Sequence, residues 1–328
     1  MLHLRDMPGI FTISLDFELH WGVFDKRNKE QRLTCYRNTI ALVPELLHMF
    51  QQYQVHVTWA TVASLFARSY EEWQKLSPQL KPTYANTANS AYVYIDKNGF
   101  DTVAHLASKE VLEIEQYEGQ ELATHTYSHY YCLEEGQTAQ QFDADLKAVN
   151  AASDALGVPR PTSIVFPRNQ FNQRYLSVCY QNGITVIRSN PAKWFWSAIT
   201  EEKTTLVRKL LRTGDTYLPI GGKMTYPLSA IKPKEGMPLE LPASRFLRSY
   251  DAKRPVLNKL RLRRILNEMT YAAEHSECYH LWWHPEQFGD YPAESLADLT
   301  IILQHYRHLQ HKLGMTSLNM REYRDIIT

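Results

Sequence analysis

The sequence predicts a single-domain α/β fold in which parallel strands and helices alternate in a barrel-like arrangement. Apolar runs of strand length alternate with helical patterns almost from end to end of the 328 residues. Neither a linker nor a low-complexity tract or internal repeat divides the chain, so we expect residues 1–328 to form one domain. The composition, with 44% hydrophobic and 22% charged residues, is typical of a globular protein.

The first third of the chain begins this alternation. Residues 11–17 (FTISLDF) are rich in β-branched and aromatic side chains and predict a strand. Residues 38–53 space their apolar positions for a helix, 55–61 (VHVTWAT) predict the next strand, and 62–73 predict another helix. Residues 77–99 contain Pro, Asn, Thr and Ser with little periodicity, which predicts a long loop near a site.

The middle of the chain repeats the unit. Residues 109–118 predict a helix that ends before Gly119, and 121–126 (ELATHT) predict a short strand. The most regular helical pattern covers 138–157, with good helix formers throughout and Gly157 at its end.

The last half predicts the remaining elements, with a less regular stretch over 200–245. The expected strands are 162–167, 184–190, 279–284 and 315–320, and the expected helices are 172–182, about 255–274 and 293–313. About seven parallel strands with crossover helices fit this order, and reactive side chains in such folds lie where strands end and loops begin.

Charge and cysteine content exclude several classes of protein. Thirty-six basic and 35 acidic residues give a net charge of +1, so nucleic acid is not an expected partner. Asp6, Pro8 and Gly9 interrupt the N-terminal segment, and no apolar run is long enough for a membrane-spanning helix. Four scattered cysteines form no framework, and we expect reduced thiols in a cytoplasmic protein.

Two carboxylates close the first predicted strand. Side chains two apart on a strand share a face, so Asp16 and Glu18 are expected to point into one pocket. Such a pair suits a division of labour in which one acid binds a metal and the other transfers protons. A solvated strand end is the alternative. The neighbouring Trp21 is expected to form an aromatic wall there, although ordinary packing explains it equally well.

A histidine pair follows the strand at 121–126. The spacing of His125 and His129 is a common way to hold zinc on one face of a helix. The spacing alone is weak, because His280 and His284 repeat it. The position at a strand end favours the first pair. Two histidines and one carboxylate would leave positions open for water and substrate, as in a catalytic metal site.

Two more strand ends contain candidate residues. Arg168 follows the strand at 162–167, where a guanidinium can pair with a carboxylate, although a surface salt bridge is the commoner fate. His284 ends the strand at 279–284, next to Trp282 and Trp283, which would desolvate it or stack on a ring-shaped ligand. A core histidine is the alternative for His284.

These strand ends contain, in order, SLDFELHWG, ATHTYSH, FPRNQ and HLWWHPEQFG. This order resembles that of the polysaccharide deacetylase family (NodB homology, carbohydrate esterase family 4), from about residue 10 to 320. The resemblance implies a distorted (β/α)7 barrel that hydrolyses N-acetyl amides on sugars with a divalent metal. The family's first motif usually reads TFDDG, with adjacent aspartates, whereas here a phenylalanine separates Asp16 from Glu18.

The resemblance also implies roles for individual residues. The metal ligands that it implies are Glu18, His125 and His129. The catalytic residues that it implies are Asp16 as base, Arg168 as the arginine that orients the base, and His284 as general acid. Trp21 and Trp283 are expected to contact the substrate. Zinc is the expected metal, with cobalt, nickel or manganese as alternatives.

The expected function is removal of an N-acyl group from an amino sugar in a polysaccharide or glycan precursor. Residues 245–264 contain eight basic side chains and one acidic one, which suggests peripheral contact with a lipid-linked glycan or, alternatively, a solvated helix face. Two alternatives for the whole chain stay open. One is hydrolysis of a cyclic amide, as in allantoinases, and the other is an inactive glycan-binding homologue.

Overall fold

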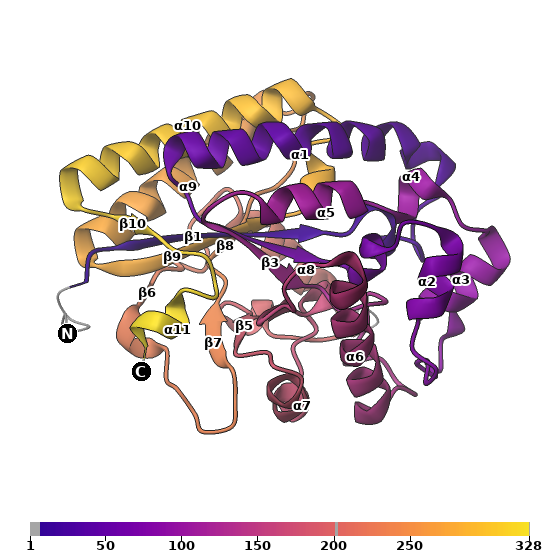
Figure 1. Ribbon diagram of the computed structural model, residues 1–328. Helices are drawn as coiled ribbons and strands as arrows, with labels where there is room; N and C mark the ends of the chain where they lie inside the picture. The colour runs from indigo at the N-terminus through magenta and orange to yellow at the C-terminus, as the bar shows by residue number, and fades with distance from the viewer. Residues whose placement is uncertain (1–6, 201–202, 328) are drawn as a thin grey trace.

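A computed structural model describes residues 7–200 and 203–327 of the chain, and it has the predicted α/β architecture (Figure 1). Seven parallel strands form the curled sheet of a distorted (β/α)7 barrel. In spatial order these strands are β9 (Glu277–Trp283), β1 (Ile10–Phe17), β2 (Val57–Thr61), β3 (Gln120–Thr124), β4 (Ser163–Val165), β5 (Val186–Ser189) and β7 (Leu239–Pro242).

The segment that contains β7 and β8 (Arg245–Phe246) joins the two sides of this sheet. Strand β7 pairs with β5, and three residues further on β8 pairs with β9. Between them, the Ser244 N–H donates to the carbonyl of His280 on β9. Strand β10 (Thr316–Ser317) pairs parallel with the first two residues of β1, and β6 (Tyr226–Pro227) pairs antiparallel with β9.

Helices surround the sheet. Three long ones, α1 (Leu33–Tyr53), α9 (Pro255–His275) and α10 (Pro292–Leu313), lie side by side over one side of the barrel (Figure 1). The other helices are α2 (Tyr70–Leu76), α3 (Ala91–Asn98), α4 (Thr102–His105), α5 (Ser108–Glu115), α6 (Ala139–Leu156), α7 (Leu176–Gln181), α8 (Leu206–Asp215) and α11 (Tyr323–Ile326). No helix among the described residues is both long enough and apolar enough to cross a membrane.

Strand β1 positions a polar side chain of the site inside the barrel. All eight of its residues are buried, as expected for a parallel strand with both faces covered. One face is apolar and packs in the main core through side chains such as Ile13 and Leu15. The other face contains Ser14 and Asp16, which bond to polar groups on other strands. Because alternate side chains of a strand share one face, Asp16 points into a buried polar region at the carboxyl end of the strand.

Helix α6 agrees closely with its prediction. Thr138 and Gln141 form a reciprocal capping box at its start, and Gly157 ends it in the left-handed conformation. The loop predicted over 77–99 is partly wrong, because Ser90 caps helix α3 within it. The helix predicted over 62–73 is a 3-10 turn at Ala63–Phe66 followed by α2.

Candidate metal centre and active site

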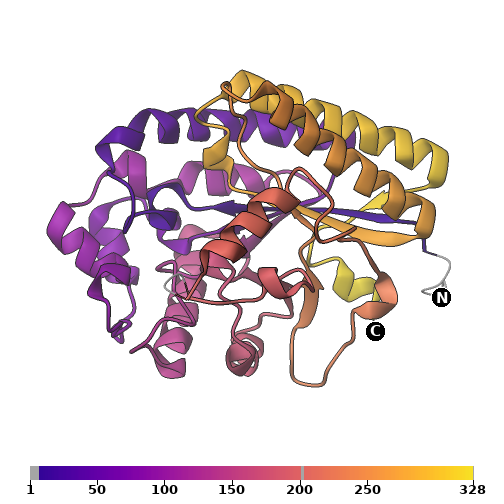
Figure 2. The same ribbon diagram turned by 180° about the vertical axis from the view of Figure 1, so that it is seen from behind.

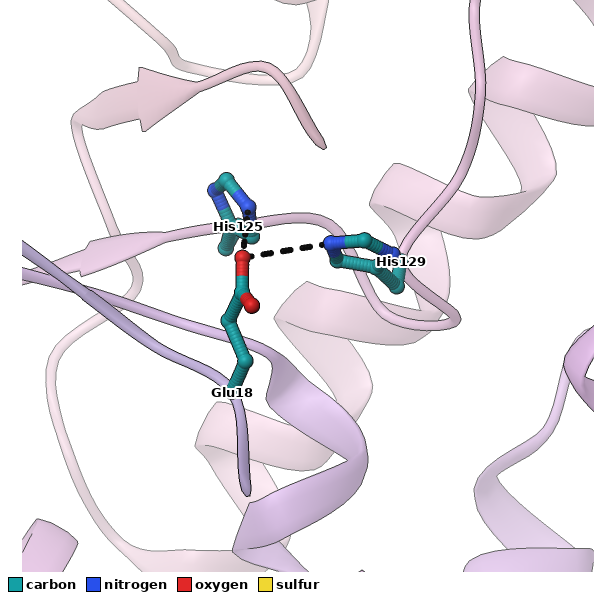
Figure 3. A group of neighbouring side chains, drawn as sticks. All are labelled: Glu18, His125 and His129. Carbon is teal, nitrogen blue, oxygen red and sulfur yellow. Dashed lines mark hydrogen bonds and ion pairs between the residues drawn. The ribbon is translucent and has the colours of Figure 1, made fainter. Parts of the chain in front are cut away.

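Side chains from two strand ends meet at the carboxyl edge of the barrel. Glu18 directly follows β1, and His125 and His129 lie in the loop that follows β3 (Figure 3). The Oε1 atom of Glu18 lies 2.9 Å from Nε2 of His125 and 3.2 Å from Nε2 of His129. All three side chains are buried. The three predicted metal ligands therefore form one compact cluster.

The histidine loop differs from the helical face that the spacing suggested. Residues 125–129 form an irregular turn in which Thr126 and His129 both have positive φ angles, 64° and 56°. Asp145 of α6 stabilises this turn, because its carboxylate accepts the N–H groups of Tyr127 at 2.7 Å and Ser128 at 3.1 Å. Burial raises the pKa of Asp145 to about 6, although the bonds from Ser128 and Tyr127 oppose that rise.

The chemistry of the cluster fits a divalent metal ion. Burial lowers the pKa of His129 to about 4, so its ring is neutral near pH 7, and its Nδ1 lies 3.1 Å from the hydroxyl of Tyr131. Neither ring nitrogen of the buried His125 has a hydrogen bond among the residues described. Burial alone would raise the pKa of Glu18, but His284 and the two histidines outweigh it and lower that pKa. Neutral imidazoles and an ionised carboxylate are suitable ligands for zinc.

Arg188 is the arginine that positions Asp16. Its two terminal nitrogens donate to the two carboxylate oxygens of Asp16, each at 2.7 Å, and the pair is almost completely buried. The same guanidinium donates to Ser14 and Asn169 and lies over the ring of Trp282, 4.3 Å from its centroid. Such a bidentate pair fixes both the position and the orientation of a carboxylate.

Arg168 was expected in this place, and that assignment needs correction. Its guanidinium pairs instead with the carboxylate of Asp25 and lies over the ring of Tyr131, 4.1 Å from the centroid. The backbone at Arg168 is left-handed, with φ 54°, because the chain turns sharply after β4. Arg168 still lines the cavity that contains Glu18 and His129.

His284 lies opposite Asp16 and Glu18. Its Nε2 is 3.9 Å from Oδ2 of Asp16 and 3.7 Å from Oε1 of Glu18. Oε1 of Gln287 accepts the backbone N–H of His284 and lies 3.4 Å from Nδ1 of its ring. Nδ1 therefore faces a hydrogen-bond acceptor, and Nε2 points toward the two carboxylates. Burial would lower the pKa of His284, but Glu18, Asp16 and Glu286 raise it.

Glu286 supports the turn that carries Glu18. Its Oε1 accepts the backbone N–H groups of Glu18 at 3.0 Å and of Leu19 at 2.5 Å, and Leu19 has a positive φ of 48°. Burial and the nearby Glu18 carboxylate raise the pKa of Glu286 to about 7. Gly22 lies directly against Glu18, because a Cβ atom at position 22 would overlap Oε2 of that side chain.

The two tryptophans expected to contact substrate are core residues. Trp21 is fully buried, stacks on Trp73 and donates from its indole to the carbonyl of His105. Trp283 is also fully buried and stacks on Phe288. The period of two along β9 explains the error for Trp283, since Trp282 shares a face with His284 and its neighbour points outward.

A cavity of about 420 Å³ opens onto these groups, within the size range of small-molecule sites. Its lining combines Glu18 and His129 of the cluster with cationic and aromatic side chains. The lining residues are Glu18, Leu19, Gly22, Val23, Arg27, Arg32, Tyr36, His129, Arg168, Ser249, His284, Glu286, Gln287 and Asp290.

Comparisons with known proteins agree with this fold. A family model described as polysaccharide deacetylase matches residues 34–187. Over this range, which is slightly less than half of the chain, the sequence is similar to the polysaccharide deacetylase family. A comparison with curated proteins found no match.

Several solved structures resemble this chain in fold at low sequence identity. A candidate polysaccharide deacetylase from Mycobacterium smegmatis is 13% identical with a TM-score of 0.57, covering 98% of this chain and 90% of its own. The α-amylase AmyC from Thermotoga maritima is 12% identical with a TM-score of 0.54, at coverages of 98% and 75%. The PuuE allantoinase is 10% identical with a TM-score of 0.52, at coverages of 96% and 89%. These likenesses show the fold alone.

The family match contains only part of the site. It includes His125, His129 and Arg168, whereas Asp16, Glu18, Arg188 and His284 lie outside it. Arg188 and Glu286 are not among the residues that the sequence patterns predict for the site. Arg188 had a usable signal, since an arginine inside the apolar strand run at 184–190 must be buried and must therefore be paired. Glu286 has no comparable signal, because a carboxylate after a strand is usually solvated.

Proposed function

We propose that this chain is a metal-dependent hydrolase that removes an N-acyl group from an amino sugar. The observation that carries the proposal is the cluster of Glu18, His125 and His129, which opens into a cavity beside Asp16 and His284. The family match over residues 34–187 and the barrel fold support a hydrolase of the deacetylase type. Fold alone does not select the reaction, since an α-amylase and an allantoinase share it.

Glu18, His125 and His129 would hold the metal ion, and we propose zinc. A zinc ion bound there would polarise the amide carbonyl and lower the pKa of its bound water. The fit rests on the buried, neutral His129, the buried ring of His125 without a hydrogen bond among the described residues, and the ionised Glu18. Three protein ligands leave room for water and substrate, as in catalytic zinc sites.

Asp16 and His284 would move the protons. Asp16 takes one proton from the attacking water, whose oxygen bonds to the acyl carbon. The bond between that carbon and the nitrogen then breaks, and His284 donates a proton to the departing amine. The products are a carboxylic acid and a free amino sugar. The 3.9 Å between Nε2 of His284 and Oδ2 of Asp16 supports these roles, because two groups so close together can both reach one amide bond.

Arg188 would act as a positioning residue in this reaction. It holds both oxygens of Asp16 from within the barrel and is not one of the residues that line the cavity. Asn169 accepts from the same guanidinium and joins the turn after β4 to this arrangement. Asp16 therefore keeps one orientation toward the water that it deprotonates.

The test combines metal content with acyl release. Wild type and a His125→Ala/His129→Ala variant are loaded with zinc and dialysed, and bound zinc and acetate release from N-acetylated sugar oligomers are measured. We expect near-stoichiometric zinc and acetate release from wild type, and loss of both from the variant. His308→Ala, at an exposed histidine on α10, is the matched control and should change neither quantity.

The outcomes separate the proposal from its alternatives. Zinc binding without acetate release, but with turnover of a cyclic amide such as allantoin, would favour the cyclic-amide hydrolase. Tight binding of sugar oligomers without zinc or turnover would favour a glycan-binding protein. Unchanged acetate release by the double variant would refute the role given to the two histidines.

A further inference from the structure

Helix α8 (Leu206–Asp215) exposes its apolar face to solvent. Leu206, Val207 and Leu210 are 71%, 60% and 63% exposed, and they lie together on one side of the helix. A helix of a globular protein normally buries this face. Figure 2 shows α8, in salmon red, across the front of the molecule with no other element over it.

The polar side of α8 packs inward instead. Arg212 donates to the carbonyl of Phe195 at 2.6 Å. Asp215 at the end of the helix is fully buried and forms ion pairs with Arg245 at 3.4 Å and Arg264 at 3.5 Å. These bonds fix the orientation of the helix, so its apolar face is held outward by charged contacts on the opposite side.

The exposed apolar surface continues beyond the helix. Trp194, which lies under the guanidinium of Arg208, is exposed, and so are Leu218 and Ile220 in the segment after α8. We call this surface the α8 patch. It comprises Trp194, Leu206, Val207, Leu210, Leu218 and Ile220.

Cationic side chains surround the α8 patch. Lys193, Lys203 and Lys209 are exposed around it. Residues 193–223 contain six basic and three acidic residues in all. Of the acids, Asp215 is neutralised by buried arginines, and the other two, at 201 and 202, lie outside the described residues.

The basic segment 245–264 is divided between surface and interior, with Lys253, Arg254, Lys259 and Arg263 exposed. Arg245 is buried in a bidentate pair with Glu268, and Arg261 is buried in a pair with Asp298. These arginines hold the barrel wall and the long helices together. The α8 patch combines several exposed apolar side chains with lysines, so it is the better candidate for a peripheral contact.

We propose that the α8 patch docks the protein on the surface of an anionic lipid bilayer. An amphipathic helix with leucines on its apolar side, a tryptophan at its edge and lysines around it has the composition of interfacial membrane-binding helices. Lysines near an anionic surface add attraction that decreases with salt. The exposed tryptophan suits the boundary between headgroups and acyl chains.

A second copy of the chain fits this surface less well. In a symmetric dimer the same patch contacts itself, so Lys193, Lys203 and Lys209 of both copies would come together. Like charges at an interface rim oppose association. An anionic bilayer instead supplies the opposite charge.

The position of the patch connects it with the active-site end of the barrel. Trp196 and Arg212, which support α8, line a small cavity together with Arg168, Asn169 and Trp282. Docking through α8 would therefore bring the membrane surface near the mouth of the site. This consequence, unlike the docking itself, rests on the proposed function.

Vesicle co-sedimentation of the full chain tests the proposal. Wild type is expected to sediment with vesicles of phosphatidylglycerol and phosphatidylcholine in equal amounts, not with pure phosphatidylcholine vesicles, and binding should decrease with salt. Leu206→Ser/Leu210→Ser should weaken binding about tenfold or more. Lys203→Gln/Lys209→Gln should weaken it about fivefold for each charge removed at low salt.

A matched control and a local probe complete the design. Leu80→Ser/Ile301→Ser removes two exposed apolar side chains far from α8 and should bind vesicles like wild type. All four native cysteines are buried, so a dye attached to Val207→Cys reports on α8 alone, and its emission should shift to the blue on anionic vesicles.

Three results would overturn the proposal. The first is absence of wild-type binding to anionic vesicles, and the second is unchanged binding of the Leu206→Ser/Leu210→Ser variant. The third is a wild-type dimer that this variant converts to monomer without any vesicle binding, which would assign the patch to a second copy. None of these results depends on hydrolase activity, so failure of the docking proposal is distinct from failure of the proposed function.

Discussion

Replacing Arg188 by methionine tests how strongly the barrel interior depends on one buried ion pair. Methionine fills similar volume but leaves Asp16 without its two 2.7 Å bonds. Asp16 is 2% exposed, so water cannot replace them. The same change removes the bonds to Ser14 and Asn169 and the contact with the ring of Trp282.

The expected loss follows from these contacts. Removing one partner of a buried charged pair typically costs about 3–5 kcal/mol, because the other charge stays buried and uncompensated. Removing both partners leaves no unpaired charge, so Arg188→Met/Asp16→Ala should be more stable than Arg188→Met alone. Arg168→Met is the matched control, since its pair with Asp25 is nearer the surface, and should cost about 1–2 kcal/mol.

Urea denaturation, followed by far-UV circular dichroism, measures these differences in five proteins: wild type, Arg188→Met, Asp16→Ala, the double variant and Arg168→Met. The cycle should show that losses from Arg188→Met and from Asp16→Ala are far from additive. If Arg188→Met cost less than Arg168→Met, or if the double variant were less stable than Arg188→Met, Asp16 would not depend on Arg188 and the assignment of its positioning residue would be wrong.

Three further changes have distinct expected results. Gly22→Ala should displace the Glu18 carboxylate and weaken zinc binding about 10–100-fold in competition with a chelator, and unchanged affinity would contradict the contact. Asp145→Asn should lower the free energy of unfolding in urea by about 1–3 kcal/mol, because buried N–H groups lose a charged acceptor. The hydrogen bond to Glu322 raises the pKa of His56, so the stability that His56→Gln removes should be present below about pH 6.5 and vanish as pH rises through the raised pKa. A melting-temperature difference that grows with pH would reverse this sign.

The order of elements was predictable because periodicity and stop signals are local. The α6 helix shows this, since its capping box and its terminal glycine are both encoded within 20 residues. Helix α3 was missed because four of its eight residues are Tyr, Asp or Asn, which are poor helix formers, and its stability comes from packing.

The candidate ligands were predictable for a different reason. Parallel strands end at one edge of the sheet, so Glu18 and His125 had to lie near each other if the strand order was right. The inward-facing side of β9 was harder to predict, because YHLWWH contains aromatic residues on both faces of the strand. Only the pairing register decides which face points into the barrel. That is why Trp283 was chosen where Trp282 lies.

The arginine that holds Asp16 could not be predicted from a sequence motif, for a physical reason. Arg168 lies at a strand end, as a motif would place it, but the left-handed turn there directs it toward Asp25. Arg188 lies inside β5 and reaches Asp16 across the barrel. A contact across the barrel depends on its curvature, which no local pattern in this sequence encodes.

The two turns that carry the proposed metal ligands are stabilised in the same way, each by a buried carboxylate. Glu286 accepts two backbone N–H groups at the turn that carries Glu18, and Asp145 accepts two at the turn that carries the histidines. Each turn contains a left-handed residue other than glycine, which is costly unless tertiary contacts fix it. Both carboxylates come from elements that only the folded barrel brings near, so the ligands are arranged by the closed fold. Preorganisation of this kind lets a site bind metal and substrate without spending binding energy on ordering its loops.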